Sequence, residues 1–224
     1  MAGVLTLIAD QQRRYPTTSQ DGGEKLVANS RNRAQKNQTQ TLRIIGGRHR
    51  GRKLAFASVE GLRPTGDRIR ETLFNWLAPH LPGARCLDLF AGSGALGFEA
   101  ISRGAGHVLL CERNNRAVAC ISDSLSILKE SVGRLHQGDA VELLEQTVEE
   151  PFDVVFLDPP FAADLWQVCI DRLTPWLAKE AMVYIESGTD CPYQVPSHWH
   201  LHRDKRAGNV RYCLYRVETP ERIL

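Results

Sequence analysis

The sequence contains no apolar run long enough to cross a bilayer, which argues against a membrane protein. Its first residues, MAGVLTLIAD, include a short apolar patch with no basic residue before it. A signal peptide is therefore not expected, and we predict a cytoplasmic protein. The six cysteines form no CxxC pair and no zinc-like spacing, so we expect them to be reduced and structural, and we expect no metal site.

The composition, 42% hydrophobic and 24% charged over 224 residues, is that of a soluble globular protein with one well-packed domain and appendages. The net charge of +2 hides an asymmetry. Residues 1–70 contain fourteen Lys/Arg and five Asp/Glu, a net charge of +9, whereas residues 71–224 carry a net charge of −7. A basic N-terminal part on an acidic body indicates a polyanionic partner, and a solvated basic tail is the alternative.

The N-terminal part divides into a tail and a small folded element. Residues 1–41 are polar and basic with little apolar periodicity, so we expect a disordered tail. Residues 42–83 begin with LRIIGGRHRGRKLAFA, which predicts two strands around glycines. RPTGDRIRETLFNWLAP then predicts a helix with Asp67 as its N-cap. The basic residues of the hairpin are Arg43, Arg48, Arg50, Arg52 and Lys53.

Residues 84–218 show apolar strands that alternate with helical patterns. The predicted strands are 85–89, 107–112, 132–136, 152–157 and 181–186, and the predicted helices are 95–103, 114–129, 140–148 and 164–178. This alternation indicates an α/β fold in which helices cover both faces of a parallel sheet. WHLHRDKR and NVRYCLYRV have no helix between them and predict an antiparallel hairpin at the sheet edge.

A glycine-rich loop, DLFAGSGALG at residues 88–97, follows the first of these strands and opens a helix. Gly92, Gly94 and Gly97 match the GxGxxG pattern, in which the backbone passes close to a ligand at a helix N-terminus. The pattern alone fits a dinucleotide site equally well.

Acidic residues follow three consecutive strands. Asp88 precedes the glycine loop, where a carboxylate suits a cationic ligand better than a pyrophosphate, and Glu112 is placed to accept hydrogen bonds from ribose hydroxyls. Asp139 could accept one from an adenine amino group, although Asp88 and Asp139 could each simply be a helix N-cap. Because the three residues share one edge of the sheet, we predict a site for a positively charged nucleoside such as S-adenosylmethionine.

The stretch FDVVFLDPPF, residues 152–161, predicts a buried strand that ends in a carboxylate and two prolines. A nucleobase amino group is a poor nucleophile, and its methylation requires acceptors for its N–H bonds. Asp158 and the Pro159 carbonyl can supply them, while Pro159 and Pro160 fix φ and remove N–H donors. Phe161 can stack on an extruded base. The alternative is a strand stopped by Pro-Pro, with Asp158 as a turn residue.

These motifs resemble those of class I S-adenosylmethionine-dependent methyltransferases. LRIIGGRHRGRKL, GLRPTGDRIRETLFNWL, CLDLFAGSGALGFEA and VFLDPPF are similar to the bacterial small-subunit (16S) ribosomal RNA guanine-N2 methyltransferases. The resemblance implies a Rossmann-like, seven-stranded, mostly parallel sheet with an antiparallel last strand. It also implies methylation of one guanine in the 30S subunit or its assembly intermediate by a monomeric enzyme.

The resemblance assigns roles to particular residues. The cofactor site would comprise Asp88, Phe90, Ala91, Gly92, Ser93, Gly94, Glu112, Arg113, Asp139 and Ala140. The guanine would be held by Asp158, Pro159, Pro160 and Phe161. From the basic charge of the N-terminal part, we separately predict that the RNA is bound by Arg43, Arg48, Arg50, Arg52, Lys53 and Arg63.

Several alternatives stay open from the sequence. A nicotinamide-dependent oxidoreductase would use the glycine loop but not DPPF, a non-catalytic RNA-binding protein would need none of the acids, and DNA adenine methyltransferases share the Pro-Pro-aromatic motif. The histidines of HWHLH could bind a metal or, more simply, form an RNA-facing or solvated edge. Arg63, Thr65 and Arg70 could close over the cofactor or be salt-bridged helix residues.

Overall fold

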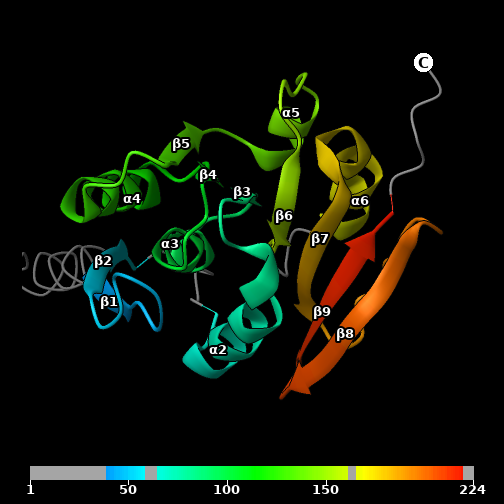
Figure 1. The fold of residues 1–224 in the computed structure, drawn as a ribbon, viewed down its shortest axis with the longest axis horizontal. Coiled ribbons are helices and arrows are strands. Elements are labelled where there is room, and N and C mark those ends of the chain that lie inside the picture. Colours follow the sequence, from blue (N-terminus) through cyan, green and yellow to red (C-terminus); the bar gives the residue numbers. More distant parts are fainter. Residues whose placement is uncertain (1–38, 59–64, 161–164, 219–224) are drawn as a thin grey trace, which may run out of the picture. The chain divides into compact units, whose positions relative to one another are not determined.

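The computed structural model describes residues 39–58, 65–160 and 165–218 (Figure 1). The predicted tail up to residue 38, Arg63 and Phe161 lie outside these ranges.

A seven-stranded sheet forms the centre of the fold, with the strand order β5-β4-β3-β6-β7-β9-β8 (Figure 1). Its strands are β3 (Arg85–Asp88), β4 (His107–Glu112), β5 (Gly133–Gln137), β6 (Phe152–Leu157), β7 (Leu177–Gly188), β8 (Trp199–Ala207) and β9 (Val210–Val217). The strands from β5 to β7 pair in parallel, and β9 pairs antiparallel with both β7 and β8. The predicted mostly parallel sheet with a reversed last strand is confirmed.

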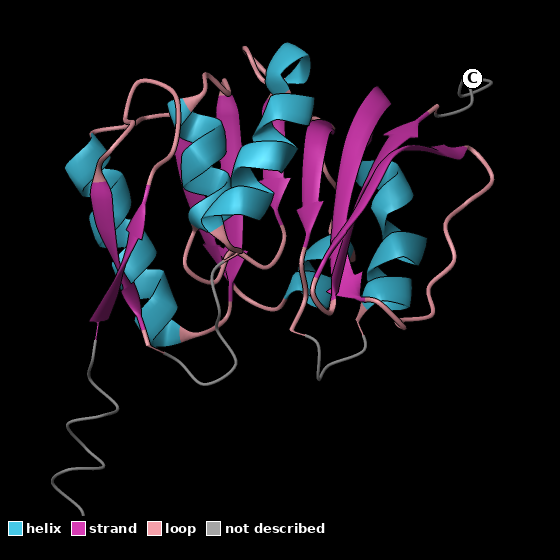
Figure 2. Ribbon diagram, turned by 90° about the horizontal axis from the view of Figure 1, so that it is seen from below, coloured by secondary structure: helices cyan, strands magenta, loops and turns pink. Residues whose placement is uncertain are grey.

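Helices lie on both sides of the strands (Figure 2). One hydrophobic core joins the sheet to α2 (Asp67–Trp76), α3 (Ala95–Ser102) and α4 (Asn115–Leu128), and a second joins it to α5 (Ala140–Leu144) and α6 (Trp166–Leu173). Side chains alternate along each strand, so Phe156 and Tyr184 enter the first core while Leu157 and Ile185 enter the second. The near-continuous apolar strands predicted from the sequence follow from this burial on two faces.

The predicted N-terminal hairpin is a separate two-stranded sheet, β1 (Thr39–Arg43) and β2 (Lys53–Ala57). It contributes Leu42, Leu54 and Phe56 to the first core. The loop between the strands approaches the end of α3 so closely that a Cβ atom at Gly47, whose φ is +72°, would collide with the carbonyl of Ser102. Glycine is therefore required at this contact.

Three predicted helix boundaries are wrong. The helix predicted over 140–148 is shorter, because α5 ends at Leu144. Asp67 is the first residue of α2 rather than its N-cap, because Gly66 takes the cap position and the Asp67 carboxylate pairs with Arg70 at 2.5 Å. The helix predicted over 164–178 divides into α6 and the 3-10 turn η3 (Thr174–Trp176), since Pro175 cannot continue the hydrogen-bond ladder of an α-helix. A second 3-10 turn, η1 (Ala78–His80), follows α2.

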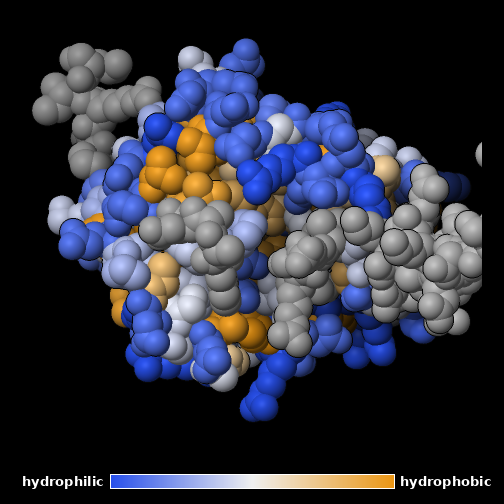
Figure 3. Space-filling view, turned by 180° about the vertical axis from the view of Figure 1, so that it is seen from behind, coloured by the Kyte–Doolittle hydropathy of each residue, from blue (hydrophilic) through white to orange (hydrophobic). Residues whose placement is uncertain are grey.

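The face opposite to that of Figure 1 is mostly hydrophilic, with hydrophobic residues gathered in patches (Figure 3). Among the described large hydrophobic side chains, those of Ile127 and Leu201 are the markedly exposed ones. None of the described helices is long and apolar enough to span a membrane. The six cysteines are free, as predicted.

The histidine-containing strand β8 exposes nearly all of its side chains. His200 lies 3.6 Å from the carboxylate of Glu218. Within the described ranges, no cluster of three or more His, Cys, Asp or Glu residues could hold a metal ion.

Candidate active site

The carboxyl ends of the parallel strands bring the predicted acidic residues to one edge of the sheet. Asp88 ends β3, Glu112 ends β4, Asp139 follows β5 and Asp158 follows β6. In open α/β sheets this edge is where ligands bind.

The glycine loop between β3 and α3 is held by backbone hydrogen bonds and by Glu112. Gly92 and Gly94 have positive φ angles of 54° and 75°. The Gly92 N–H donates to Glu112 Oε2 at 2.7 Å, and the Ala91 N–H donates to the carbonyl of Cys111 at 2.9 Å. A Cβ atom at Gly94 would collide with the ring of Phe98, so the tight turn depends on glycine there.

Asp88 is buried beneath this loop, with 2% of its surface exposed. Its Oδ2 atom accepts a hydrogen bond from the Gly97 N–H at 2.9 Å, in the first turn of α3. Burial raises the pKa of this carboxyl group to about 7. The hydrogen bond from Gly97 lowers the pKa in part, and the charge of Glu112 raises it further. Such a carboxylate is stabilised by a cationic ligand group, which suits the predicted cofactor.

Glu112 and Asp139 both accept hydrogen bonds from the backbone. Glu112 accepts from Asn114 as well as Gly92, and Asp139 caps α5 by accepting from the Val141 N–H at 2.8 Å. Asp139 therefore has the N-cap role that the sequence left open, although its Oδ2 atom is directed toward Arg113 at 3.5 Å. Each carboxylate retains acceptor capacity for a ligand.

The remaining predicted cofactor residues line the same loop and helix start. Ala91, Ser93 and Ala140 are buried, and Phe90 is partly buried against the second core. Because Ala91 and Ser93 have small side chains, the backbone of the loop is the surface nearest to a ligand.

Asp158 is half-buried at the end of β6, followed by a buried Pro159 and an exposed Pro160. Its Oδ2 atom accepts a hydrogen bond from the Thr65 hydroxyl at 3.3 Å. Burial raises the pKa of Asp158 well above its ordinary value, and the charges of Glu186 and Asp88 raise it further. The carboxyl group therefore takes up protons more readily than a solvated aspartate does.

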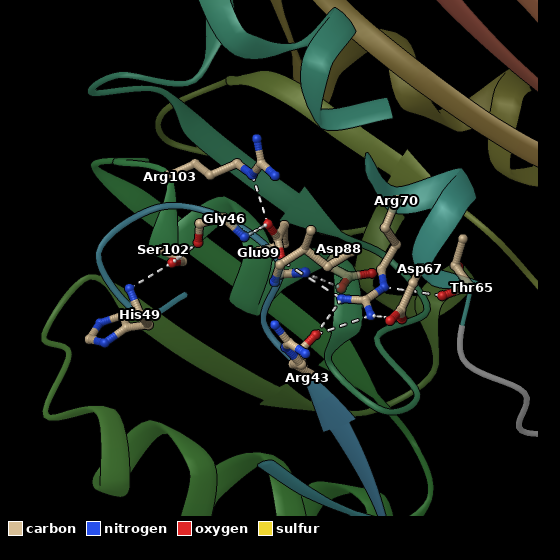
Figure 4. A network of polar contacts seen from close by, with 12 residues as sticks. Arg43, Gly46, His49, Thr65, Asp67, Arg70, Asp88, Glu99, Ser102 and Arg103 are labelled. Carbon is tan, nitrogen blue, oxygen red and sulfur yellow. Dashed lines mark hydrogen bonds and ion pairs between the residues drawn. The ribbon is translucent and has the colours of Figure 1, made fainter. Parts of the chain in front are cut away.

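Arg70 occupies the centre of a buried polar network that joins the hairpin to the site (Figure 4). It is 1% exposed, and its guanidinium donates to the carbonyls of Thr65 and Arg43 at 3.1 Å. Fully buried Glu99 lies 3.7 Å from it and accepts hydrogen bonds from the Ile45 and Gly46 N–H groups. Of the two roles considered for Arg70, the structure favours the salt-bridged one, and it places Thr65 against Asp158.

The predicted RNA-binding side chains of the hairpin are exposed. These residues are Arg43, Arg48, Arg50, Arg52 and Lys53. Arg48 also forms an ion pair with Glu130 at 2.8 Å, and His49 contacts the same carboxylate at 2.5 Å. The loop between β1 and β2 is thereby attached to Glu130, which follows α4.

Sequence reasoning missed Glu186, which lies near the end of β7 with 6% of its surface exposed. Its Oε2 atom accepts a hydrogen bond from Tyr184 at 2.7 Å, and burial raises its pKa. The sequence does contain a pattern that could have indicated it: the predicted strand AMVYIE ends in an acid, as do the strands that end at Asp88 and Glu112.

Comparisons with known proteins agree with this arrangement. The family model described as Conserved hypothetical protein 95 matches residues 42–216. Ribosomal RNA small subunit methyltransferase D of Escherichia coli K12 is 47% identical over 180 residues, which cover 79% of this chain and 90% of the relative. The protein of the same name from Haemophilus influenzae is 45% identical, with 78% and 93% covered.

A solved methyltransferase structure from Escherichia coli has a TM-score of 0.74 and 48% identity, and the match covers 81% of this chain and all of that one. The similarity thus extends over the hairpin, the glycine loop and DPPF, and it includes nearly the whole length of each relative. The chain belongs to the family of the ribosomal RNA small subunit methyltransferases D.

Proposed function

We propose that this protein transfers a methyl group from S-adenosylmethionine to the exocyclic N2 amine of one guanine in the RNA of the small ribosomal subunit. The proposal rests on family membership and, above all, on the position of Asp158 at the carboxyl end of β6, on the same sheet edge as the glycine loop. An amine-methylating enzyme needs an acceptor at this position, whereas a dehydrogenase has no use for it.

One set of residues is proposed to bind the guanine and another to bind the cofactor. Asp158 and the Pro159 carbonyl accept hydrogen bonds from the guanine amine and favour its tetrahedral form, and Phe161 stacks on the base. S-adenosylmethionine supplies an activated methyl group on a sulfonium. Its cationic groups suit buried Asp88. The raised pKa of this residue shows that its ionised form is poorly stabilised in the free protein, so a nearby positive charge would stabilise it. Glu112 and Asp139 hold the nucleoside, together with Arg113 and Ala140.

The substrate is an RNA–protein particle, the 30S subunit or its assembly intermediate. The exposed basic side chains of the hairpin bind its phosphates. The same role is proposed for Arg63 from the sequence alone. A deletion strain tests the proposal: nucleoside mass spectrometry of its 16S RNA should show the loss of one N2-methylguanosine, restored by the gene. Unchanged N2-methylguanosine would contradict the proposal.

Cofactor affinity should depend on pH through Asp88. A cationic ligand favours the ionised carboxylate, so the affinity for S-adenosylmethionine should fall as pH drops below about 7, by about tenfold per unit. Asp88→Asn keeps an acceptor for the Gly97 N–H but does not titrate, and its affinity should vary much less below pH 7. Calorimetry of both proteins between pH 5 and 7 checks this, and equal pH dependence would contradict it.

The hairpin should account for the salt dependence of particle binding. Arg50→Ala, Arg52→Ala and Lys53→Ala together should weaken binding to 30S particles and lower the log–log salt slope by about 0.7–0.9 per lost phosphate contact. The matched control removes the same charge from exposed β8, at Arg203, Lys205 and Arg206. Equal losses in both triple variants would indicate a general charge effect and contradict a specific role for the hairpin.

A further inference from the structure

Asp158 and Glu186 are neighbours across the sheet. Strands β6 and β7 pair in parallel with Leu157 opposite Ile185, so the next residue on each strand is an acid. Both acids continue the face of Phe156 and Tyr184, which is the face covered by α2. Two carboxyl groups therefore lie side by side at the end of the sheet where the target amine is expected.

Thr65 lies between the two acids. Its hydroxyl donates to Asp158 Oδ2 at 3.3 Å. The Thr65 side chain is also within hydrogen-bonding reach of Glu186. Burial raises the pKa of Glu186, and its hydrogen bonds with Tyr184 and Thr65 lower that pKa in part. Thr65 and Glu186 are each 6% exposed, and Tyr184, which donates to Glu186, is fully buried. Because a hydroxyl carries one proton and two lone pairs, it can donate to one carboxylate and accept from the other when that one is protonated.

Among the described residues, the side chains whose charges or hydrogen bonds shift the pKa values of this pair are neutral or acidic. For Asp158 they are Glu186 on β7, Asp88 at the end of β3 and Thr65 in the segment before α2, and for Glu186 they are Tyr184 and Thr65. Burial raises the pKa of both carboxyl groups. Because the charge of Glu186 raises the pKa of Asp158, ionisation of both carboxyl groups at once is disfavoured, as in other carboxylate pairs.

We propose that Asp158 and Glu186 take up a single proton and share it through Thr65, and that Glu186 is a positioning residue whose charge makes the ionised Asp158 a base for the target amine. This inference rests on the proposed function. In the reaction the amine nitrogen bonds to the methyl carbon, the carbon–sulfur bond breaks and its electron pair stays on sulfur. The nitrogen then loses one proton, which the ionised pair accepts as its single shared proton and later releases to water.

The pairing has a catalytic consequence. An isolated aspartate with a pKa of about 4 is a weak base at neutral pH. A carboxylate beside an ionised acidic neighbour binds a proton more tightly, which brings its pKa nearer to the working pH. Glu186 thus acts through Asp158 and needs no contact with the substrate.

The pair can be tested in the free protein, without RNA or cofactor. With carboxyl carbons labelled by 13C in Asp and Glu, NMR should show Asp158, assigned with Asp158→Asn, titrating well above its ordinary range. Glu186→Gln still accepts from Tyr184 but carries no charge, so Asp158 should titrate at lower pH in this variant. The control Glu180→Gln, on the exposed part of β7, should leave Asp158 unchanged. An ordinary Asp158 titration in the wild type, or none of this shift in Glu186→Gln, would overturn the proposal.

Its link to the reaction is tested by single-turnover methyl transfer to 30S particles as a function of pH. Glu186→Gln should slow transfer and move the acidic limb of the rate profile to lower pH. Thr65→Val should slow transfer and Thr65→Ser should restore it. A Glu186 that only supports the fold would lower thermal stability without moving the limb. If NMR finds the shared proton but the wild type transfers no methyl group, the proposed function fails and the proton sharing stands.

Discussion

The variant Asp158→Ala is expected to transfer methyl groups about 10²–10³-fold more slowly than the wild type, the usual cost of removing one preorganised hydrogen-bond partner of a transition state. It should stay folded, because the side chain is half-buried at a strand end and hydrogen bonds to Thr65 alone among the described side chains. It should also bind S-adenosylmethionine, since the glycine loop is held by Glu112 and Asp88.

The loss should lie in turnover and not in cofactor affinity, because the hydrogen bond to the amine strengthens as the nitrogen becomes tetrahedral. Asp158→Asn is the matched variant: its amide oxygen still accepts a hydrogen bond but takes up no proton, so its defect should be smaller than that of Asp158→Ala but still clear. Single-turnover rates and calorimetry on both variants separate the effects. Near-normal transfer by a folded Asp158→Ala protein would mean that Asp158 is only a turn residue.

The second large effect is expected on stability. Arg70→Ala should lower the free energy of unfolding by about 3–5 kcal/mol, because it leaves Glu99 buried with one cation fewer and removes the donor to two carbonyl groups. Glu99 keeps its contact with Arg103 at 2.7 Å, which places the expected value toward the lower end of that range. In this variant, Arg43 of the hairpin and Thr65 both lose the hydrogen bonds that their carbonyl groups accept from Arg70.

Arg68→Ala on the exposed side of the same helix is the control, with an expected change within about 0.5 kcal/mol. Urea unfolding of both variants measures the difference. If Arg70→Ala and Arg68→Ala are equally stable, the network of Figure 4 does not hold the hairpin in place.

The sheet was predictable because its strands are buried on two faces and read as apolar runs. The glycine loop and the acids at the ends of β3 and β4 followed from the same pattern, since parallel strands bring their carboxyl ends to one edge. The end of α6 was not predicted, because Pro175 can begin a helical turn as well as stop one, and tertiary contacts decided between the two.

Each acid of the pair stands at the end of a predicted strand, but their pairing could not be predicted from the sequence. Glu186 is 28 positions from Asp158 in the sequence, and only the register of β6 against β7 makes them neighbours. Thr65 reaches the pair because buried Arg70 holds its carbonyl, a contact between α2 and the chain before it that no local pattern encodes. The residues proposed to act directly on a ligand were thus readable from motifs. Glu186 and Thr65, which are proposed to act through Asp158, depended on strand pairing and on the contact with Arg70.

The most direct test of the central claim is the identity of the nucleoside that the purified protein methylates. The protein is incubated with S-adenosylmethionine labelled in its methyl group and with 30S particles from the deletion strain, naked 16S RNA or double-stranded DNA, and the digested nucleosides are separated by mass spectrometry. We predict label in N2-methylguanosine at one guanine of the particle RNA, and little in the other two substrates. Label in N6-methyladenosine, or label in DNA in place of the particle, would contradict the account.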